Sequence, residues 1–238
     1  MFINALGVAP TAIRSLAALF DRCASGVQRS EPLAIVRSEF DKLHAAYHEV
    51  FSGEIHQFTV SLFDRYFFSD CVESFSRSYD IAGDAMETRS GTNECARALR
   101  ALLGAGGRGF KELGARVSTY AYGEVLKEFA SLFTETVCTQ VVMQKRFNEW
   151  GALLLQGEVS AAVRVFEEAD SDCDNISIQV MFEKLKWTVK ILSIIQPVDI
   201  QRYHIPSSCM SEELVRSIMG RRVDLSRVAV ENVKLTFV

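Results

Sequence analysis

The stretch that decides the fold is Glu31-Pro-Leu-Ala-Ile-Val-Arg-Ser-Glu-Phe40-Asp-Lys-Leu-His-Ala-Ala-Tyr-His-Glu-Val50. Its apolar residues recur every third or fourth position, which is the spacing of one helix face. They are Leu33, Val36, Phe40, Leu43, Tyr47 and Val50. The pattern then shifts by one residue, as in a stutter, and resumes at Phe51, Ile55, Phe58 and Leu62. With Pro32 in the first turn, this stretch predicts a helix that ends near Tyr66 and is about 50 Å long if it is unbroken, with a bend at Gly53 as the alternative.

Proline placement extends the helical prediction to most of the chain. Prolines occur only at positions 10, 32, 197 and 206, so residues 33–196 lack the strongest helix breaker. Further helices are expected at residues 10–23, 67–79, 94–103, 117–144, 158–169, 176–195, 211–219 and 224–234, with Ser211 and Asp224 as N-caps of the last two. The helix that ends at residue 144 has an alternative start at Phe110. The sequence therefore predicts an all-α protein of elongated antiparallel helical bundles, with more than roughly 65% helix against a base rate of about a third.

One short segment interrupts this pattern more sharply than any other. Asp170-Ser-Asp-Cys-Asp-Asn175 is acidic, and its only apolar residue is a cysteine. We therefore expect a helical bundle domain over residues 1–169, an acidic linker over 170–175 and a small C-terminal helical domain over 176–238.

Composition narrows the class of protein. The chain of 238 residues is 48% hydrophobic and 24% charged, as in ordinary globular proteins. A net charge of −4 disfavours nucleic acid as a partner. The six cysteines are too widely spaced for a metal knuckle or a disulfide scaffold, and indicate reduced thiols in the cytosol. A signal peptide and a membrane span are not expected, so membrane contact should be peripheral or through a partner.

Two motifs resemble chemical sites but lack the context that each site needs. Gly104-Ala-Gly-Gly-Arg-Gly109 matches a dinucleotide motif, but a helix rather than a strand is expected before it, which favours a helix end. Asp170, Asp172 and Asp174 match the start of a calcium loop that then lacks its glycine and its final carboxylate. The sequence predicts no catalytic, cofactor or metal-binding residue and no enzyme, although a triad could still assemble from distant positions.

Two further groups of residues, a histidine pair and an aromatic cluster, can each be interpreted as a binding site or as ordinary structure. His44 and His48 lie one helical turn apart and could share a metal, but the glutamate of the usual zinc motif is missing, and exposed polar histidines are favoured. An aromatic cluster is expected in the core rather than at a ligand site. It comprises Phe63, Tyr66, Phe67, Phe68, Phe75 and Tyr79.

Several motifs in a fixed order carry a resemblance to a known family. Phe147-Asn-Glu-Trp-Gly151 is followed by a helix, then by Phe182-Glu-Lys-Leu185, and then by Ser211-Glu-Glu-Leu-Val-Arg-Ser-Ile-Met-Gly-Arg-Arg-Val-Asp-Leu225. In order and spacing, these motifs resemble the C-terminal region of subunit four of the conserved oligomeric Golgi complex. Upstream segments at Phe2–Leu6, Ser38–Leu43 and Val72–Phe75 fall in similar places, so the resemblance covers essentially the whole chain.

The resemblance implies a helical-rod subunit of a multisubunit tether that captures vesicles at the Golgi, mainly for retrograde traffic. Other subunits, SNARE proteins and Rab regulators would be its partners, and it would be cytosolic and peripherally associated with the Golgi membrane. The alternative is a helical-bundle adaptor or regulatory protein outside the Golgi.

The resemblance also implies an ion pair between two helices of the C-terminal part. The family has an arginine where this chain has Lys184, and a glutamate where it has Leu214, with Glu213 adjacent. Lysine lacks the planar, bidentate fork of arginine, so the pair is altered here. The candidate interaction residues are Lys184, Glu212, Glu213, Arg221 and Arg222; for the last two, a solvated helix end is the alternative.

Overall fold

The computed structural model describes residues 31–81, 93–103, 110, 113, 117–170 and 178–238. About 75% of these residues are helical and they form no strand, which confirms the all-α prediction. The α-helices are α2 (Glu31–Tyr66), α3 (Phe68–Ser74), α5 (Glu94–Leu103), α7 (Thr119–Thr136), α8 (Glu149–Asp170), α9 (Glu183–Leu192), α10 (Glu212–Met219) and α11 (Arg227–Asn232). A π-helix, η1 (Val137–Val142), continues α7, and η2 (Gln179–Phe182) and η3 (Pro197–Arg202) are 3-10 helices.

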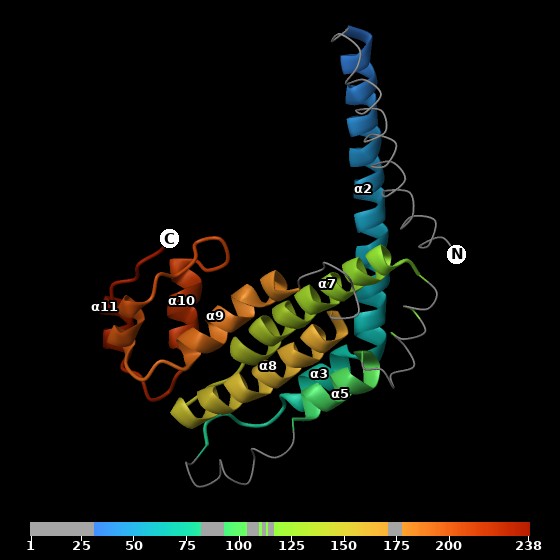
Figure 1. Cartoon of the computed structure of the whole chain (residues 1–238). Coiled ribbons are helices and arrows are strands. Elements are labelled where there is room, and N and C mark those ends of the chain that lie inside the picture. Colours follow the sequence, from blue (N-terminus) through green and yellow to red (C-terminus); the bar gives the residue numbers. More distant parts are fainter. Residues whose placement is uncertain (1–30, 82–92, 104–109, 111–112, 114–116, 171–177) are drawn as a thin grey trace.

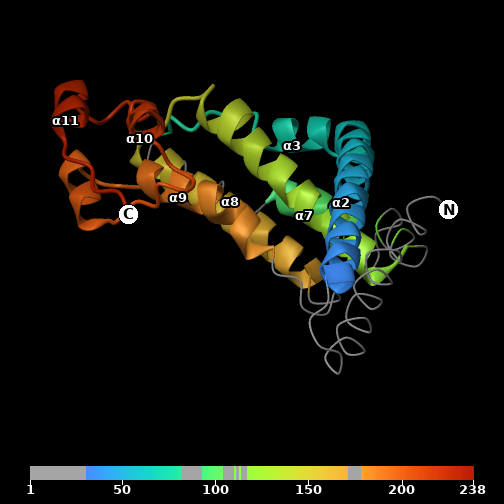
Figure 2. The same cartoon turned by 90° about the horizontal axis from the view of Figure 1, so that it is seen from above.

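The helices form an elongated body with a projecting rod. α7, α8 and α9 lie side by side, α2 crosses one end of them, and α10 and α11 lie at the other end (Figures 1 and 2). α3 and α5 pack against each other, and α5 also packs on α8. The N-terminal part of α2 extends beyond this body (Figure 1).

α2 is one unbroken helix, as the sequence predicts, but its two apolar stretches have different surroundings. Phe51, Ile55 and Phe63 are buried against the bundle, each less than 5% exposed. In the preceding stretch, Leu43 and Val50 are each 54% exposed. Only the part of α2 that crosses α7 therefore contributes to the core of the described structure.

Aromatic rings hold the bundle together. Their centroids lie 5.0–6.5 Å apart in tilted or edge-on contacts, the geometry that aromatic pairs favour. The rings are those of Phe63, Phe67, Phe129, Phe133, Phe166 and Phe182. Phe166 lies in the last part of α8, within the predicted bundle domain, whereas Phe182 belongs to the predicted C-terminal domain, so one core runs across the predicted boundary. Most of the predicted linker lies outside the described residues.

Helix ends show which boundaries the sequence could locate. Ser211 caps α10, as predicted, by accepting a hydrogen bond from the Leu214 amide at 3.2 Å. The prediction that Asp224 caps the last helix is wrong, because Ser226 precedes α11 and Asp224 contacts α8 instead. The predicted helix over residues 67–79 ends early, at Ser74.

Candidate functional site

Three segments that are distant in sequence run side by side where α8 begins. Tyr79 pairs with Phe147 and Phe147 pairs with Arg222, both as parallel bridges. The Phe147 amide donates to the Arg221 carbonyl at 2.9 Å, and the Val223 amide donates to the Phe147 carbonyl at 2.8 Å. We call this contact of residues 79–81, 147–151 and 221–224 the junction. It joins the bundle to the C-terminal helices.

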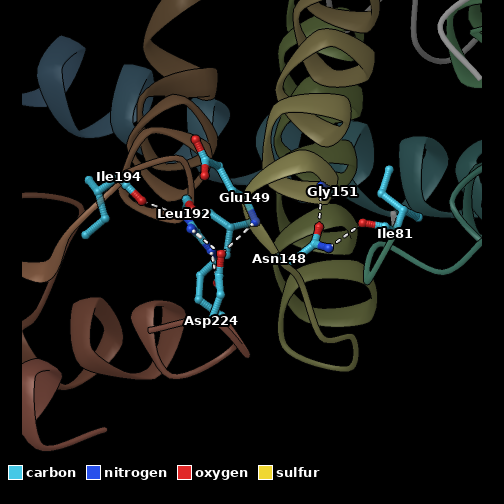
Figure 3. A network of polar contacts seen from close by, with 8 residues as sticks. Ile81, Asn148, Glu149, Gly151, Leu192, Ile194 and Asp224 are labelled. Carbon is cyan, nitrogen blue, oxygen red and sulfur yellow. Dashed lines mark hydrogen bonds and ion pairs between the residues drawn. The ribbon is translucent and has the colours of Figure 1, made fainter. Parts of the chain in front are cut away.

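Asn148 and Gly151 let the chain segments approach closely at the junction. The Asn148 side chain accepts from the Gly151 amide at 2.9 Å and donates to the Ile81 carbonyl, so it begins α8 and ties it to the segment after α3 (Figure 3). A Cβ atom on Gly151 would lie 1.6 Å from the Tyr79 carbonyl oxygen. Only glycine fits here, because the two backbones are in contact.

Arg222 forms the second half of the junction, and its side chain is only 1% exposed. Its guanidinium binds both carboxylate oxygens of Asp224, Nε to Oδ1 at 2.8 Å and Nη2 to Oδ2 at 2.9 Å. Nη1 donates to the carbonyls of Leu192 and Ile194 at the end of α9. The alternative of a solvated helix end is therefore wrong for Arg222.

Asp224 links Arg222 to the N-terminus of α8. Its Oδ2 atom accepts from the Glu149 amide at 3.0 Å (Figure 3). Partial burial raises the pKa of Asp224, but hydrogen bonds and charge from Arg222, together with the backbone amides, outweigh this and leave it below its ordinary value of 3.8. The carboxylate is thus held ionised between a guanidinium and a helix N-terminus, where both stabilise negative charge.

Arg216 fixes α11 in a similar way. Its guanidinium donates to the backbone carbonyls of Val230, Glu231 and Val233 at 2.6, 2.9 and 3.2 Å. It also binds Glu212 at 2.8 Å, one turn earlier on α10. Arg216 thereby satisfies carbonyls at the end of α11 that the helix itself leaves free.

An open cavity of about 740 Å³ lies against this scaffold, and we call it the arginine cavity. Arg216 and Arg222 line it, as do three further arginines that form no ion pair within the described part of the chain. These three are Arg146, Arg221 and Arg227. Glu213 and Glu231 also line the cavity, so its charge is mixed with a basic excess.

The structure brings together some of the predicted interaction residues and separates others. Glu213, Arg221 and Arg222 all line the arginine cavity, and Glu212 binds its neighbour Arg216. Lys184 lies elsewhere: its Nζ atom pairs with Glu135 of α7 at 2.7 Å. The ion pair of Lys184 thus connects α9 to α7, and the predicted pairing with Glu212 or Glu213 is replaced by this contact.

Two of the three family-like motifs meet at the junction. Phe147, Asn148 and Gly151 supply the bridge, the cap and the close approach, and Arg222 and Asp224 supply the buried pair. The pairing of Tyr79 with Phe147 was not predicted from the sequence, which indicated only that Tyr79 belongs to the core. No local pattern shows that the segment after α3 would pair with Phe147.

A buried polar cluster beside the junction was also missed. Glu158 on α8 is 6% exposed, accepts from the Tyr79 hydroxyl at 2.6 Å and lies 3.5 Å from the Arg77 guanidinium. Burial raises the pKa of Glu158, and the Tyr79 hydrogen bond and the Arg77 charge only partly oppose this. Through these two contacts Glu158 links α8 to the segment that follows α3.

The motifs that resembled chemical sites have these outcomes. The residues before the glycine cluster form helix α5, as expected, while residues 104–109 and the aspartates at 172 and 174 lie outside the described residues. His44 and His48 have ring centroids 6.4 Å apart, and the described residues contain no group of three or more side chains able to hold a metal ion. Among the described helices, none combines the length and the apolar character that crossing a membrane requires.

The described residues form a helical protein whose C-terminal helices are joined to the bundle at the junction, with a basic cavity beside them. No family model and no curated protein sequence matches the chain.

Proposed function

We propose that this chain is a subunit of a multisubunit vesicle-tethering complex at the Golgi, which acts by protein–protein contacts in intra-Golgi retrograde traffic. It performs no reaction and needs no cofactor. Its partners are the other subunits, SNARE proteins and Rab-type proteins, and it associates peripherally with the Golgi membrane.

The junction is the observation that carries this proposal. The family resemblance depends on separate motifs around Phe147 and Arg222, which lie 75 residues apart in the sequence. The backbone bonds at Phe147 and the Asp224 contact with α8 bring them into one structural unit. Motifs with a shared structural task support a resemblance more strongly than motifs scattered over a surface.

The arginine cavity is the surface that we assign to a partner. Arg146, Arg221 and Arg227 present guanidinium groups without ion pairs among the described residues, on a scaffold held by Arg216 and Arg222. Arginine is enriched at the energetic centres of protein interfaces because it combines charge, planarity and an apolar stem. An acidic segment of another subunit suits this surface.

A co-purification experiment tests the proposal. The full chain, tagged in cells, is isolated and its partners are identified by mass spectrometry, alongside a variant carrying Arg146→Glu, Arg221→Glu and Arg227→Glu. We expect subunits of the Golgi tethering complex with the wild-type chain and their loss with the variant. Arg65→Glu, Arg97→Glu and Arg100→Glu, which reverse three exposed arginines of α2 and α5, serve as a matched control.

The alternative, a helical adaptor outside the Golgi, predicts a different result. The wild-type chain would then recover a reproducible set of partners that lacks Golgi tethering subunits. Such a set would overturn the Golgi assignment, and its sensitivity to the cavity variant would still report on the arginine cavity.

A further inference from the structure

A second open groove, separate from the arginine cavity, runs between α8 and α9 and has a volume of about 650 Å³. Its floor is apolar and rigid, because Val159, Val163, Val189 and Ile194 are each less than 7% exposed and belong to the core. Since both walls are helices packed on each other, the groove is preformed in the fold.

One end of the groove carries an exposed apolar side chain. Leu153 lines the groove there and is 37% exposed. Large apolar side chains beside an open groove are the usual anchors of a helix that binds there. Ser160, two turns further along α8, is a small lining residue that leaves room for an approaching backbone.

The rim of the groove is basic. Arg164, Lys186 and Lys190 line it against a single carboxylate, Glu167. Arg164 and Lys186 form no ion pair with the described residues. Lys190 is held above the rings of Trp187 and Tyr203, at 4.3 and 4.1 Å from their centroids, so its charge is fixed at the edge of the groove.

From this combination we propose that the α8–α9 groove binds an amphipathic helix of another protein, with its apolar face on Leu153 and the valine floor and acidic residues along its edges. Charge complementarity selects an acidic helix, because the rim has a net positive charge while the chain as a whole is negative. This inference rests on the proposed function in that both assume a protein that acts by binding proteins. It concerns a different surface from the arginine cavity.

The test uses the full chain and two synthetic peptides of about 20 residues, long enough for a helix of roughly 30 Å. Both carry leucines on one helix face; one has glutamates along the flanks, and the other has lysines at the same positions. Binding is measured by fluorescence anisotropy of labelled peptide.

We expect the acidic peptide to bind and the basic one to bind at least tenfold more weakly. Arg164→Glu with Lys186→Glu should reverse this preference, and Leu153→Ala should weaken the acidic peptide by roughly fivefold or more. Arg97→Glu with Arg100→Glu is the matched control for net charge, and helicity by circular dichroism should be unchanged in all variants.

Equal weakening by the control pair, or no effect of Leu153→Ala, would show charge attraction without a groove and would overturn the inference. Absence of binding by the acidic peptide would do the same. Because the co-purification experiment addresses the arginine cavity, loss of the groove proposal leaves the Golgi assignment standing. Failure of that assignment in turn leaves the peptide result intact.

Discussion

Arg222 and Asp224, two residues apart, form a two-point ion pair that joins two helices to the segment between α10 and α11. The guanidinium satisfies carbonyls after α9, and the carboxylate satisfies an amide at the start of α8. Because each side chain of the pair also forms hydrogen bonds with backbone groups of another segment, the pair links α8, α9 and the segment between α10 and α11.

Replacing Arg222 with methionine should destabilise the protein by about 3–5 kcal/mol. The change leaves the Asp224 carboxylate without its buried partner and the carbonyls of Leu192 and Ile194 without a donor. Urea denaturation followed by circular dichroism measures the loss. Arg221→Met, at the partly exposed neighbour, is the control and should stay within about 0.5 kcal/mol of wild type. Similar losses in both variants would contradict the central role of Arg222.

Two glycines of α8 should respond in opposite directions to alanine. Gly151→Ala places a Cβ atom 1.6 Å from the Tyr79 carbonyl oxygen, so the segments must separate at a cost of roughly 3 kcal/mol or more. Gly157→Ala meets nothing within 4 Å and should stabilise the helix by up to about 1 kcal/mol, because alanine favours helix. Thermal unfolding of both variants gives the comparison. A Gly151→Ala protein as stable as wild type would mean that the segments are not in contact.

The pH dependence of stability should change in Glu158→Gln. Since the pKa of Glu158 is raised in the folded state, folding takes up a proton, and its contribution to stability is lost as pH rises from 4.5 through the raised value. Glutamine can still accept from the Tyr79 hydroxyl but does not titrate. The free energy of unfolding of the variant, minus that of wild type, should therefore increase with pH over this range. A difference that is flat or falls would refute the desolvation of Glu158.

Thiol reactivity should follow burial. Cys71, Cys95 and Cys138 are at most 4% exposed, whereas Cys209 is partly exposed. Burial also raises the pKa of Cys138 to about 11, so its thiolate is scarce at neutral pH. Brief treatment of the native chain with iodoacetamide should label Cys209 well before these three, and all four should react in denaturant. Peptide mass spectrometry reads the order, which early labelling of Cys138 would contradict.

Much of the fold was predictable because helices leave local marks. The periodicity from Phe51 to Leu62, the missing prolines and the Ser211 cap depend on residues within one or two turns, and each is confirmed by a helix or a cap in the structure. Asp224 was misassigned for the same reason. An aspartate before a short helix is a good local cap, but a guanidinium and the start of α8 bind it instead.

The sequence by itself determined the class of fold, most helices and the motifs around Phe147 and Arg222, since these follow from spacing along the chain. Only the tertiary structure decided that Arg222 is buried while Arg221 lines a cavity, and that Lys184 pairs with Glu135. It also decided that Phe51, Ile55 and Phe63 of α2 are buried whereas Leu43 and Val50 are exposed. These outcomes depend on which surfaces meet across many residues. The identical side chains of Arg221 and Arg222 acquire different roles because the segment between α10 and α11 pairs with Phe147 and directs only Arg222 into the core.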